Sequence, residues 1–357
     1  MTEQESVAIM LNWGIAGTGE IARAFALALH HAENCCAYGV AGRNPERTRA
    51  FAFDHKIEHH FDSYEEMFRD PGVDIVYVCS PHPFHAELAC RALEAGKHVL
   101  CEKPMAMSMD ELHGMYAAAK ANNRLLLEGY MYRCHPQTEA LVKLIADGTV
   151  GRIRAVEAGF CFACKFDPSY RLFSPELGGG AVWDVGGYPL SMANLIAAAA
   201  NKNALLSPVK LDAVGILAEN GVDLQSSAIA VYPNEIIARM TAGCDVNQDN
   251  TLRIYGTRGR ITVFDPWVCD RRNPPLGRIL VEVSGEEPET ICVPARKTSF
   301  AYEAEYFASL VAEGKTDAEF PVMSASESLL QNHLLQCWVN KIGAVGSVKQ
   351  GEFTFAE

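Results

Sequence analysis

The sequence of 357 residues lacks a long apolar run, a surplus of basic residues and any internal repeat or low-complexity linker. Its most apolar stretch, residues 195–200, is far shorter than the roughly 20 residues that cross a bilayer, and the polar, acidic start MTEQES does not resemble a secretory signal. Lysine and arginine total 31 against 44 acidic residues, and a net charge of −13 argues against broad binding to nucleic acid or anionic lipid. We therefore expect a cytoplasmic protein with no membrane and no nucleic-acid partner.

The 12 cysteines lack the paired spacing of a zinc site or a disulfide framework. Cys161 and Cys164 form a CxxC within GFCFACKF, but this segment has a strand pattern, and strand positions three apart point to opposite faces. No second cysteine pair or histidine pair lies near them. We predict reduced structural thiols and no metal.

The first third of the chain alternates short apolar runs with helical stretches, which is the pattern of parallel βαβ units. Strands are predicted over residues 11–16, 37–41, 73–79, 99–101 and 125–128. Helices are predicted over residues 21–30, 84–95 and 108–122. The last helix begins with a capping box formed by Ser108 and Glu111.

After Gly151 the pattern changes to longer strands of alternating polarity. These are predicted over residues 153–162, 213–217, 228–232, 236–240, 252–255, 261–264 and 279–283. Helices over residues 302–312 and 325–339 complete the chain. We predict an α/β protein with two closely packed domains, the first over residues 8–131 and the second, of α+β type, over residues 132–357.

A glycine motif, G-x-G-x-x-A, separates the first predicted strand from the first helix. Gly17 permits the tight turn, Gly19 lets a pyrophosphate approach the backbone, and Ala22 lets the helix and strand pack closely. The amides at a helix N-terminus hold phosphates. The alternative is a glycine turn without a ligand. We place a dinucleotide on this turn, at Gly17, Thr18, Gly19, Glu20 and Ile21.

The second predicted strand ends without the acidic residue that an NAD site usually presents to the ribose about 20 residues after the glycines. It ends instead in Ala-Gly-Arg-Asn, with Arg43 at the tip and Arg47 one helical turn away. An arginine there can pair with a 2′-phosphate and stack on adenine. The alternative is that both arginines are solvated charges. We predict NADP(H) as the cofactor, with NAD(H) as the less favoured choice.

Two further segments follow strands of the predicted parallel sheet, where loops line the ligand crevice. Ser80, Pro81 and His85 come after the strand that ends at Cys79, and His85 either touches the cofactor or only packs. The second segment is LCEKPMA, in which Glu102 and Lys103 close another strand. The following proline restricts the backbone of Lys103, so its side chain emerges in a fixed direction. We predict that all five residues border the cofactor.

The segment GGGAVWDVGGY in the second domain joins three glycines to a helix that is expected to begin directly after them. Asp184 and Tyr188 are four residues apart and share one helix face, where a carboxylate and a phenol near a lysine can relay a proton. Arg171 and Trp183 add a polar contact and an apolar wall, which suit a hydroxylated ring. The alternative is a glycine hinge, a helix-start aspartate and a core tyrosine.

Taken in this order, G-x-G-x-x-A, E-K-P and GGG-x-x-x-D-x-x-x-Y resemble the Gfo/Idh/MocA family of glucose–fructose oxidoreductases and inositol dehydrogenases. Residues 166–190 look closest to its dihydrodiol and NADP-dependent D-xylose dehydrogenases. The resemblance implies a Rossmann domain followed by a domain with a large open, mostly antiparallel sheet that often forms oligomers, so we expect a homodimer or homotetramer. It also implies that Lys103 is catalytic, that its bond to Pro104 is cis, and that Asp184 and Tyr188 complete the catalytic set.

These observations predict an NADP-dependent oxidoreductase, such as a sugar dehydrogenase. It would transfer a hydride between nicotinamide and a carbinol or carbonyl carbon of a sugar, polyol or vicinal diol. Lys103 and Tyr188 would handle the proton. The predicted substrate contacts are Lys103, Arg171, Trp183, Asp184 and Tyr188. The alternatives are a non-catalytic, NADP-bound sugar sensor of the same fold and a redox-neutral, NAD-dependent glycosidase, which fits the segment at 166–190 less well.

Overall fold

The computed structural model describes residues 10–271 and 276–345. Residues 8, 9, 272–275 and 346–357 of the two predicted domains therefore lie outside the described residues. Within the described ranges, no helix is long and apolar enough to cross a membrane.

The N-terminal part is a six-stranded parallel sheet with the order β3-β2-β1-β4-β5-β6. The order reverses between β1 and β4, which is the switch point where ligands bind in open α/β sheets. The strands are β1 (Leu11–Ala16), β2 (Cys35–Ala41), β3 (His59–Phe61), β4 (Ile75–Val78), β5 (His98–Glu102) and β6 (Leu126–Gly129). The helices are α1 (Glu20–Leu29), α2 (Pro45–Asp54), α3 (Tyr64–Arg69), α4 (His85–Glu94) and α5 (Met109–Ala121). The predicted Rossmann architecture is confirmed, although β3, α2 and α3 were not predicted.

The second sheet has eight strands in the order β14-β13-β12-β11-β7-β10-β9-β8, and only β7 and β10 pair in parallel. Its strands are β7 (Ile153–Cys161), β8 (Lys210–Leu217), β9 (Asp223–Val231), β10 (Ile237–Gly243), β11 (Leu252–Gly256), β12 (Gly259–Val263), β13 (Leu276–Val283) and β14 (Glu289–Pro294). The associated helices are α6 (Pro136–Ala146), α7 (Gly187–Ala199), α8 (Ser299–Ala312) and α9 (Ala325–Ile342). The large, mostly antiparallel sheet is confirmed, whereas β14 and α6 were not predicted.

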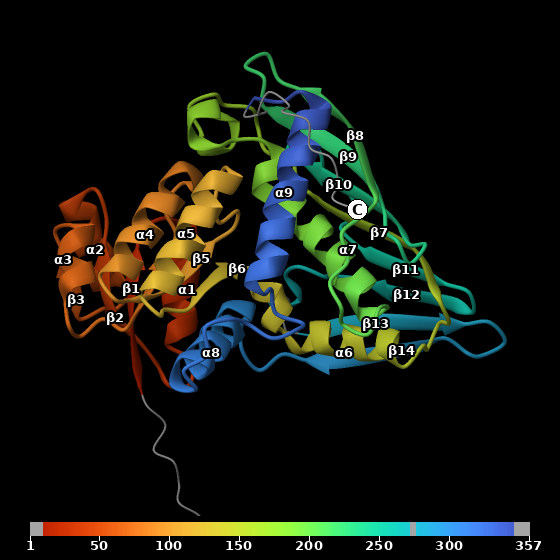
Figure 1. Ribbon diagram of the computed structural model, residues 1–357, viewed down its shortest axis with the longest axis horizontal. Helices are drawn as coiled ribbons and strands as arrows, with labels where there is room; N and C mark the ends of the chain where they lie inside the picture. The colour runs from red at the N-terminus through yellow and green to blue at the C-terminus, as the bar shows by residue number, and fades with distance from the viewer. Residues whose placement is uncertain (1–9, 272–275, 346–357) are drawn as a thin grey trace, which may run out of the picture.

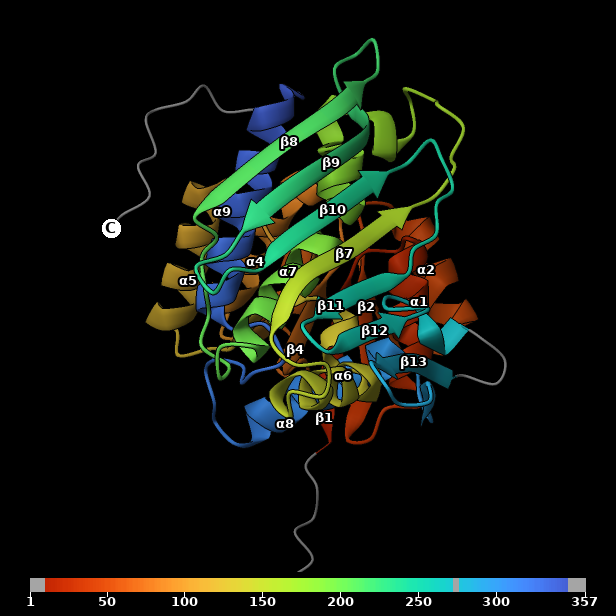
Figure 2. The ribbon, with the colours of Figure 1, turned by 90° about the vertical axis from the view of Figure 1, so that its right-hand side faces the viewer.

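Helices α7 and α9 lie between the two sheets and cover the inner face of the larger one (Figure 1). Every residue of α7 is buried, because the helix GYPLSMANLIAAA is apolar on all sides and is enclosed by β7, β10 and α9. Among the described residues, no helix covers the outer face of the large sheet, which faces the viewer in Figure 2.

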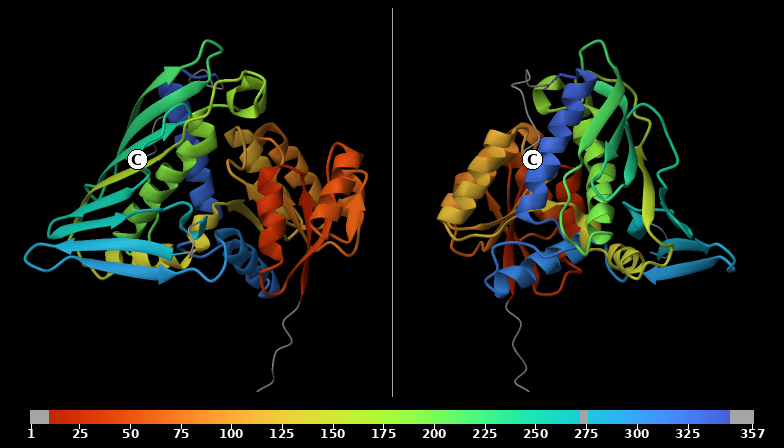
Figure 3. Two further views of the ribbon diagram at one scale, coloured as in Figure 1. Left: turned by 180° about the vertical axis from the view of Figure 1, so that it is seen from behind. Right: turned by 45° about the vertical axis from the view of Figure 1, so that its right-hand side comes forward.

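Helix α8 returns to the N-terminal domain and packs on α1, as both views in Figure 3 show. Its Phe307 ring lies 5.4 Å from Trp13 of β1, and its Phe300 ring lies 6.3 Å from Phe25 of α1. Aromatic pairs at such distances stabilise a core beyond the area they bury. A helix near the C-terminus therefore completes the core of the nucleotide-binding domain. The predicted domain, which ends at residue 131, does not include this helix.

Candidate active site

The glycine turn after β1 has the geometry that a bound pyrophosphate requires. Gly17 has φ +145°, and a Cβ on it would lie 2.9 Å from the Cys79 carbonyl oxygen. A Cβ on Gly19 would meet no atom within 4 Å, so the backbone before α1 is open to a ligand. The first-turn amides of α1 begin directly after it, at Glu20 and Ile21. These residues fit a dinucleotide.

A pocket of about 120 Å³ lies at the carboxyl ends of β2 and β4, where the adenosine end of a dinucleotide would lie. The Arg43 guanidinium is 5.3 Å from the centre of the Phe84 ring, so it forms one wall. Arg47 instead donates a hydrogen bond of 2.9 Å to the carbonyl of Thr18 and holds the glycine turn. The lining residues are Arg43, Tyr64, Ser80, Pro81, Phe84, Glu87, Leu88 and Arg91.

His85 is fully buried and joins the two loops that border this crevice. Its Nδ1 lies 2.9 Å from the Pro104 carbonyl oxygen, and its Nε2 lies 2.7 Å from the Ser80 carbonyl oxygen. Burial lowers the pKa of His85, although the two carbonyls oppose this shift. The geometry matches the packing alternative, in which His85 acts on the crevice through the loops it joins.

Lys103 directly follows β5, and its bond to Pro104 is cis. Its ammonium crosses to the second domain and donates a hydrogen bond of 2.5 Å to the backbone carbonyl of Asp184. The Asp184 carboxylate lies 3.9 Å from the same ammonium and accepts a hydrogen bond of 3.1 Å from Arg171, at the start of a short 3₁₀ turn (Arg171–Phe173). The structure thus brings together three of the predicted site residues from two domains.

Two buried carboxyl groups flank Lys103 and differ in their electrostatics. Burial alone would raise the pKa of Asp184, but the charges of Lys103 and Arg171 outweigh it and lower this pKa. Asp184 is therefore a carboxylate at neutral pH. Burial raises the pKa of Glu102, although the charge of Lys103 opposes this shift. Glu102 also accepts a hydrogen bond from the Tyr77 hydroxyl.

Tyr188 lies beside the lysine, one turn after Asp184. The Lys103 ammonium is 5.2 Å from the centre of the Tyr188 ring, a cation–π distance. The Tyr188 hydroxyl lies 3.6 Å from the Met131 sulfur, and the ring packs against Phe160 and Trp267 at 5.1 and 5.8 Å. Asp184 and Tyr188, whose spacing of four residues predicts a shared helix face, therefore both lie close to Lys103.

The segment that carries Asp184 is an irregular helix start. The helix begins at Ala181, directly after the three glycines as predicted, and Val182–Gly186 forms a π-helical turn before α7. Such turns are rare and often occur at functional sites. Trp183 in this turn is only 2% exposed, so its predicted contact with substrate is not open in this structure.

His82 is a residue at this site that the sequence did not single out. Its Nδ1 lies 3.1 Å from the carbonyl oxygen of Gly178, so it joins the loop after β4 to the glycine segment of the second domain. Burial, followed by the neighbouring His85 and Lys103, lowers the pKa of His82 to about 3. A neutral imidazole thus connects the two domains next to Lys103. The only signal in the sequence is the position of His82 in SPHPFH after a predicted strand, and this position marks His85 as a site residue just as well.

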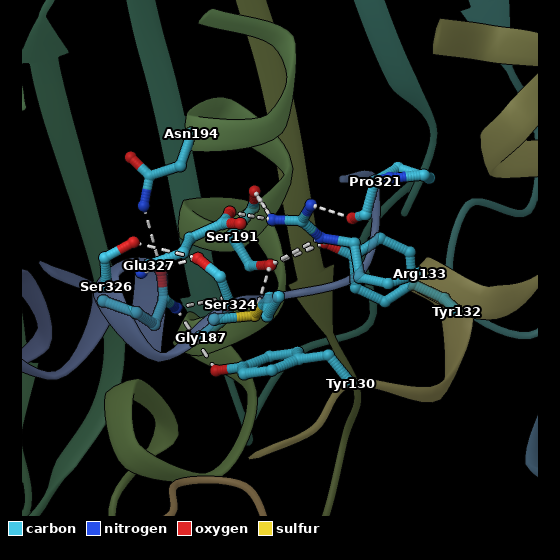
Figure 4. Close-up of polar contacts among 12 residues, drawn as sticks. Tyr130, Tyr132, Arg133, Gly187, Ser191, Asn194, Pro321, Ser324, Ser326 and Glu327 are labelled. Carbon is cyan, nitrogen blue, oxygen red and sulfur yellow. Dashed lines mark hydrogen bonds and ion pairs between the residues drawn. The ribbon is translucent and has the colours of Figure 1, made fainter. Parts of the chain in front are cut away.

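A buried polar network connects α7 with α9 and with Arg133 (Figure 4). The fully buried guanidinium of Arg133 donates to the Ser191 carbonyl at 2.9 Å and to the Pro321 carbonyl at 2.7 Å, and it forms an ion pair with Glu327 of α9. Gln331 of α9 donates to the Gly187 carbonyl at 2.8 Å. Since Ser191 is three residues after Tyr188, the network sets the position of the end of α7 that carries Tyr188.

No cluster of three or more histidine, cysteine or acidic residues that would hold a metal ion occurs in residues 10–271 and 276–345. All 12 cysteines lie within these ranges, and each is a free thiol. Cys161 is buried and Cys164 is partly exposed, at and just beyond the end of β7.

Comparisons with known proteins agree with this geometry. Residues 11–130 match the model of an oxidoreductase family with an NAD-binding Rossmann fold, and residues 138–262 match the GFO/IDH/MocA C-terminal domain. The chain is 30% identical over 335 residues to trans-1,2-dihydrobenzene-1,2-diol dehydrogenase from Homo sapiens. The aligned region covers 91% of this chain and 95% of that protein.

Two solved structures share the fold. One is a 3-ketoreductase from Actinomadura kijaniata in complex with NADP and TDP-benzene, with a TM-score of 0.82, 26% identity and coverage of 93% of this chain and 98% of that chain. The other is an aldose-aldose oxidoreductase from Caulobacter crescentus, with a TM-score of 0.81, 24% identity and coverage of 93% and 97%, which shows the fold alone. The resemblance of the motifs is confirmed, and the protein belongs to the GFO/IDH/MocA family of NAD(P)-binding oxidoreductases.

Proposed function

We propose that this protein is an NADP-dependent dehydrogenase or reductase that acts on a carbinol or carbonyl carbon of a sugar, polyol or vicinal diol. The observation that carries the proposal is the cross-domain contact of Lys103 with Asp184, beside Tyr188 and at the mouth of the dinucleotide crevice. The names of the human diol dehydrogenase and the actinobacterial ketoreductase support this substrate class. A reduced, cytoplasmic location is part of the proposal, and the free thiols support it.

The residues of the chain suit proton transfer at a hydroxyl group. Bound NADP(H) supplies or accepts the hydride. Lys103 donates or accepts the proton of the reacting oxygen, either directly or through the Tyr188 hydroxyl. The Asp184 backbone carbonyl directs the lysine ammonium, and the Asp184 carboxylate holds Arg171, whose half-exposed guanidinium can bind a further hydroxyl group of the substrate.

A spectrophotometric screen tests the proposal. NADP⁺ and NADPH are each offered with aldoses, ketoses, inositols and dihydrodiols, and absorbance of the reduced nicotinamide is followed. Net oxidation or reduction of the cofactor with a polyhydroxylated ring is the expected result. Tight cofactor binding without turnover would instead indicate the sensor alternative, and sugar release without net change of the cofactor would indicate the glycosidase alternative.

We expect Arg43→Ala to weaken the binding of NADP⁺ by about 1.5–3 kcal/mol and to change NAD⁺ binding little, because a guanidinium–phosphate contact is charge-assisted. Dissociation constants of both cofactors are measured by calorimetry. Arg49→Ala is the matched control, since Arg49 lies on α2, the helix that follows Arg43, and contacts only Asp62, at 3.9 Å, among the ion pairs of the described residues. Unchanged NADP⁺ binding in Arg43→Ala, or a wild-type preference for NAD⁺, would refute the assignment.

The proposal includes a homodimer or homotetramer formed through the outer face of the large sheet (Figure 2). Strand alternation and cross-strand pairing put four exposed apolar side chains on that face, with exposures of 74%, 60%, 49% and 46%. They are Val214, Ile216, Ile229 and Ile237. Such a patch usually marks an interface.

We therefore expect Ile216→Lys to weaken self-association, because an unpaired charge buried in the interface costs about 3 kcal/mol, or roughly 100-fold in the dissociation constant. Sedimentation velocity over a concentration series measures the effect. Phe53→Lys is the control, since Phe53 is 85% exposed on α2, in the other domain. Wild-type protein that sediments only as a monomer at micromolar concentration would rule out this interface.

A further inference from the structure

The first turn of the active-site helix is held by a buried carboxylate that belongs to none of the predicted motifs. Asp223, the first residue of β9, is 1% exposed, and its Oδ2 accepts a hydrogen bond of 2.7 Å from the Val182 amide. The amide of Ala181 also faces this carboxylate. The π-helical turn has no capping hydrogen bond from the side chain of Ala181, which precedes it. Asp223 thus supplies from another strand the acceptor that a helix N-terminus needs.

The backbone of Gly180 packs directly against the Asp223 carboxylate. A Cβ on Gly180 would lie 2.2 Å from the Asp223 Oδ1, so only glycine leaves room for the carboxylate. Burial raises the pKa of Asp223 to about 6, although the facing amides oppose this shift. The amides of the turn and their dipole favour the charged form of this carboxyl group.

The same turn directs Lys103. The Asp184 amide donates a hydrogen bond of 3.0 Å to the Gly180 carbonyl, which closes the turn at its start. The Asp184 carbonyl, at the other end of this turn, accepts the lysine ammonium at 2.5 Å. One rigid element therefore connects the Asp223 carboxylate to the group that handles the proton.

We propose that Asp223 is a positioning residue for catalysis, which fixes the Lys103 ammonium by holding the turn at residues 180–184. The inference rests on the proposed function, because the effect on turnover presupposes that Lys103 handles the substrate proton. Glycines on both sides of the turn, at 178–180 and 186–187, leave its backbone free to move once the acceptor is lost. Asp223 touches neither substrate nor cofactor in this scheme.

The test compares Asp223→Ala and Asp223→Asn with Ser226→Ala. Ser226 lies on the same strand, is 2% exposed, and exchanges hydrogen bonds with the Val214 carbonyl at 3.0 Å and the Trp338 indole at 2.6 Å. Its loss removes a similar buried polar group without touching the active-site turn. Full-length proteins are used, well below their melting temperatures.

We expect kcat to fall about 10- to 100-fold in Asp223→Ala, since displacement of a catalytic group by about 1 Å has effects of this size. Asp223→Asn should restore part of the loss, because its amide oxygen can still accept from Val182. The dissociation constant of NADP⁺ should stay unchanged in both variants, and Ser226→Ala should keep its kcat. Amides of residues 180–188 should exchange hydrogen faster in Asp223→Ala than in the wild type.

The inference is overturned if kcat, hydrogen exchange of the turn and cofactor binding all match the wild type in Asp223→Ala. It is also overturned if all three variants lose activity in proportion to their loss of thermal stability, or if the asparagine restores nothing. If Asp223→Ala does not fold, the same measurements on Asp223→Asn decide. If the wild type turns over no substrate, the proposed function fails, and the rate of Lys103 acylation, mapped by mass spectrometry, still decides whether Asp223 fixes the lysine.

Discussion

Lys103→Met should fold and bind NADP⁺ as the wild type does, while its turnover falls by roughly 10²–10⁴-fold, the usual contribution of a general acid–base group. Methionine keeps the length of the side chain and removes the ammonium. The glycine turn and the Arg43 pocket lie on other strands, so cofactor affinity should survive. Steady-state kinetics on the best substrate of the screen, cofactor calorimetry and a melting curve measure the three quantities separately.

Tyr188→Phe decides which group exchanges the proton with substrate. If the phenol is the immediate acid or base, its loss should cost as much turnover as the loss of Lys103. If lysine acts directly, the effect should be much milder, because the ring that packs against the ammonium at 5.2 Å remains.

Lys120→Met, at an exposed position on α5, is the control for the removal of a lysine in Lys103→Met. A folded Lys103→Met protein with near-normal turnover would make Lys103 a charge beside a turn.

Local patterns of the sequence predict only some parts of this protein. The glycine turn, the alternation of the strands and the position of Lys103 after an apolar strand are properties of short segments. The order of the three motifs then identified the family and placed Asp184 and Tyr188 near Lys103, although they lie in different domains. That contact spans 81 residues, and no spacing rule predicts it.

The remaining features depend on tertiary packing. Helix α8 has an ordinary amphipathic pattern, and nothing in it states that Phe300 and Phe307 return to the first domain. Asp223 lies outside the predicted strands and motifs, and only the fold brings the Val182 amide to it. Trp183 is buried in this structure, and a single sequence does not say which residues of a largely apolar segment face a cleft. The π-helical turn has no local signal at all.

The largest effect on stability is expected from Glu327→Gln, which leaves the Arg133 guanidinium buried without its counter-charge. Removal of one partner of a buried ion pair costs about 3–5 kcal/mol of the free energy of unfolding, because the remaining charge is uncompensated. Burial alone would lower the pKa of Arg133, but the charge of Glu327 outweighs it and raises this pKa. A guanidinium stays protonated at neutral pH even without a counter-charge, so Arg133 cannot escape the cost in the variant by losing its proton. Urea unfolding with and without cofactor measures the change.

An exposed ion pair and a double variant of the buried pair in Figure 4 provide the controls for Glu327→Gln. Lys143→Met breaks an exposed pair with Asp147, at 2.8 Å on α6, and should change stability by less than about 0.5 kcal/mol. Arg133→Met combined with Glu327→Leu removes both charges and should recover much of the loss, since well-packed apolar residues often replace a buried pair without cost. The Ser191 and Pro321 carbonyls would then lack their donor, so recovery should remain incomplete. If Glu327→Gln unfolds at the same urea concentration as Lys143→Met, the ion pair between Arg133 and Glu327 does not stabilise the contact of α7 with α9.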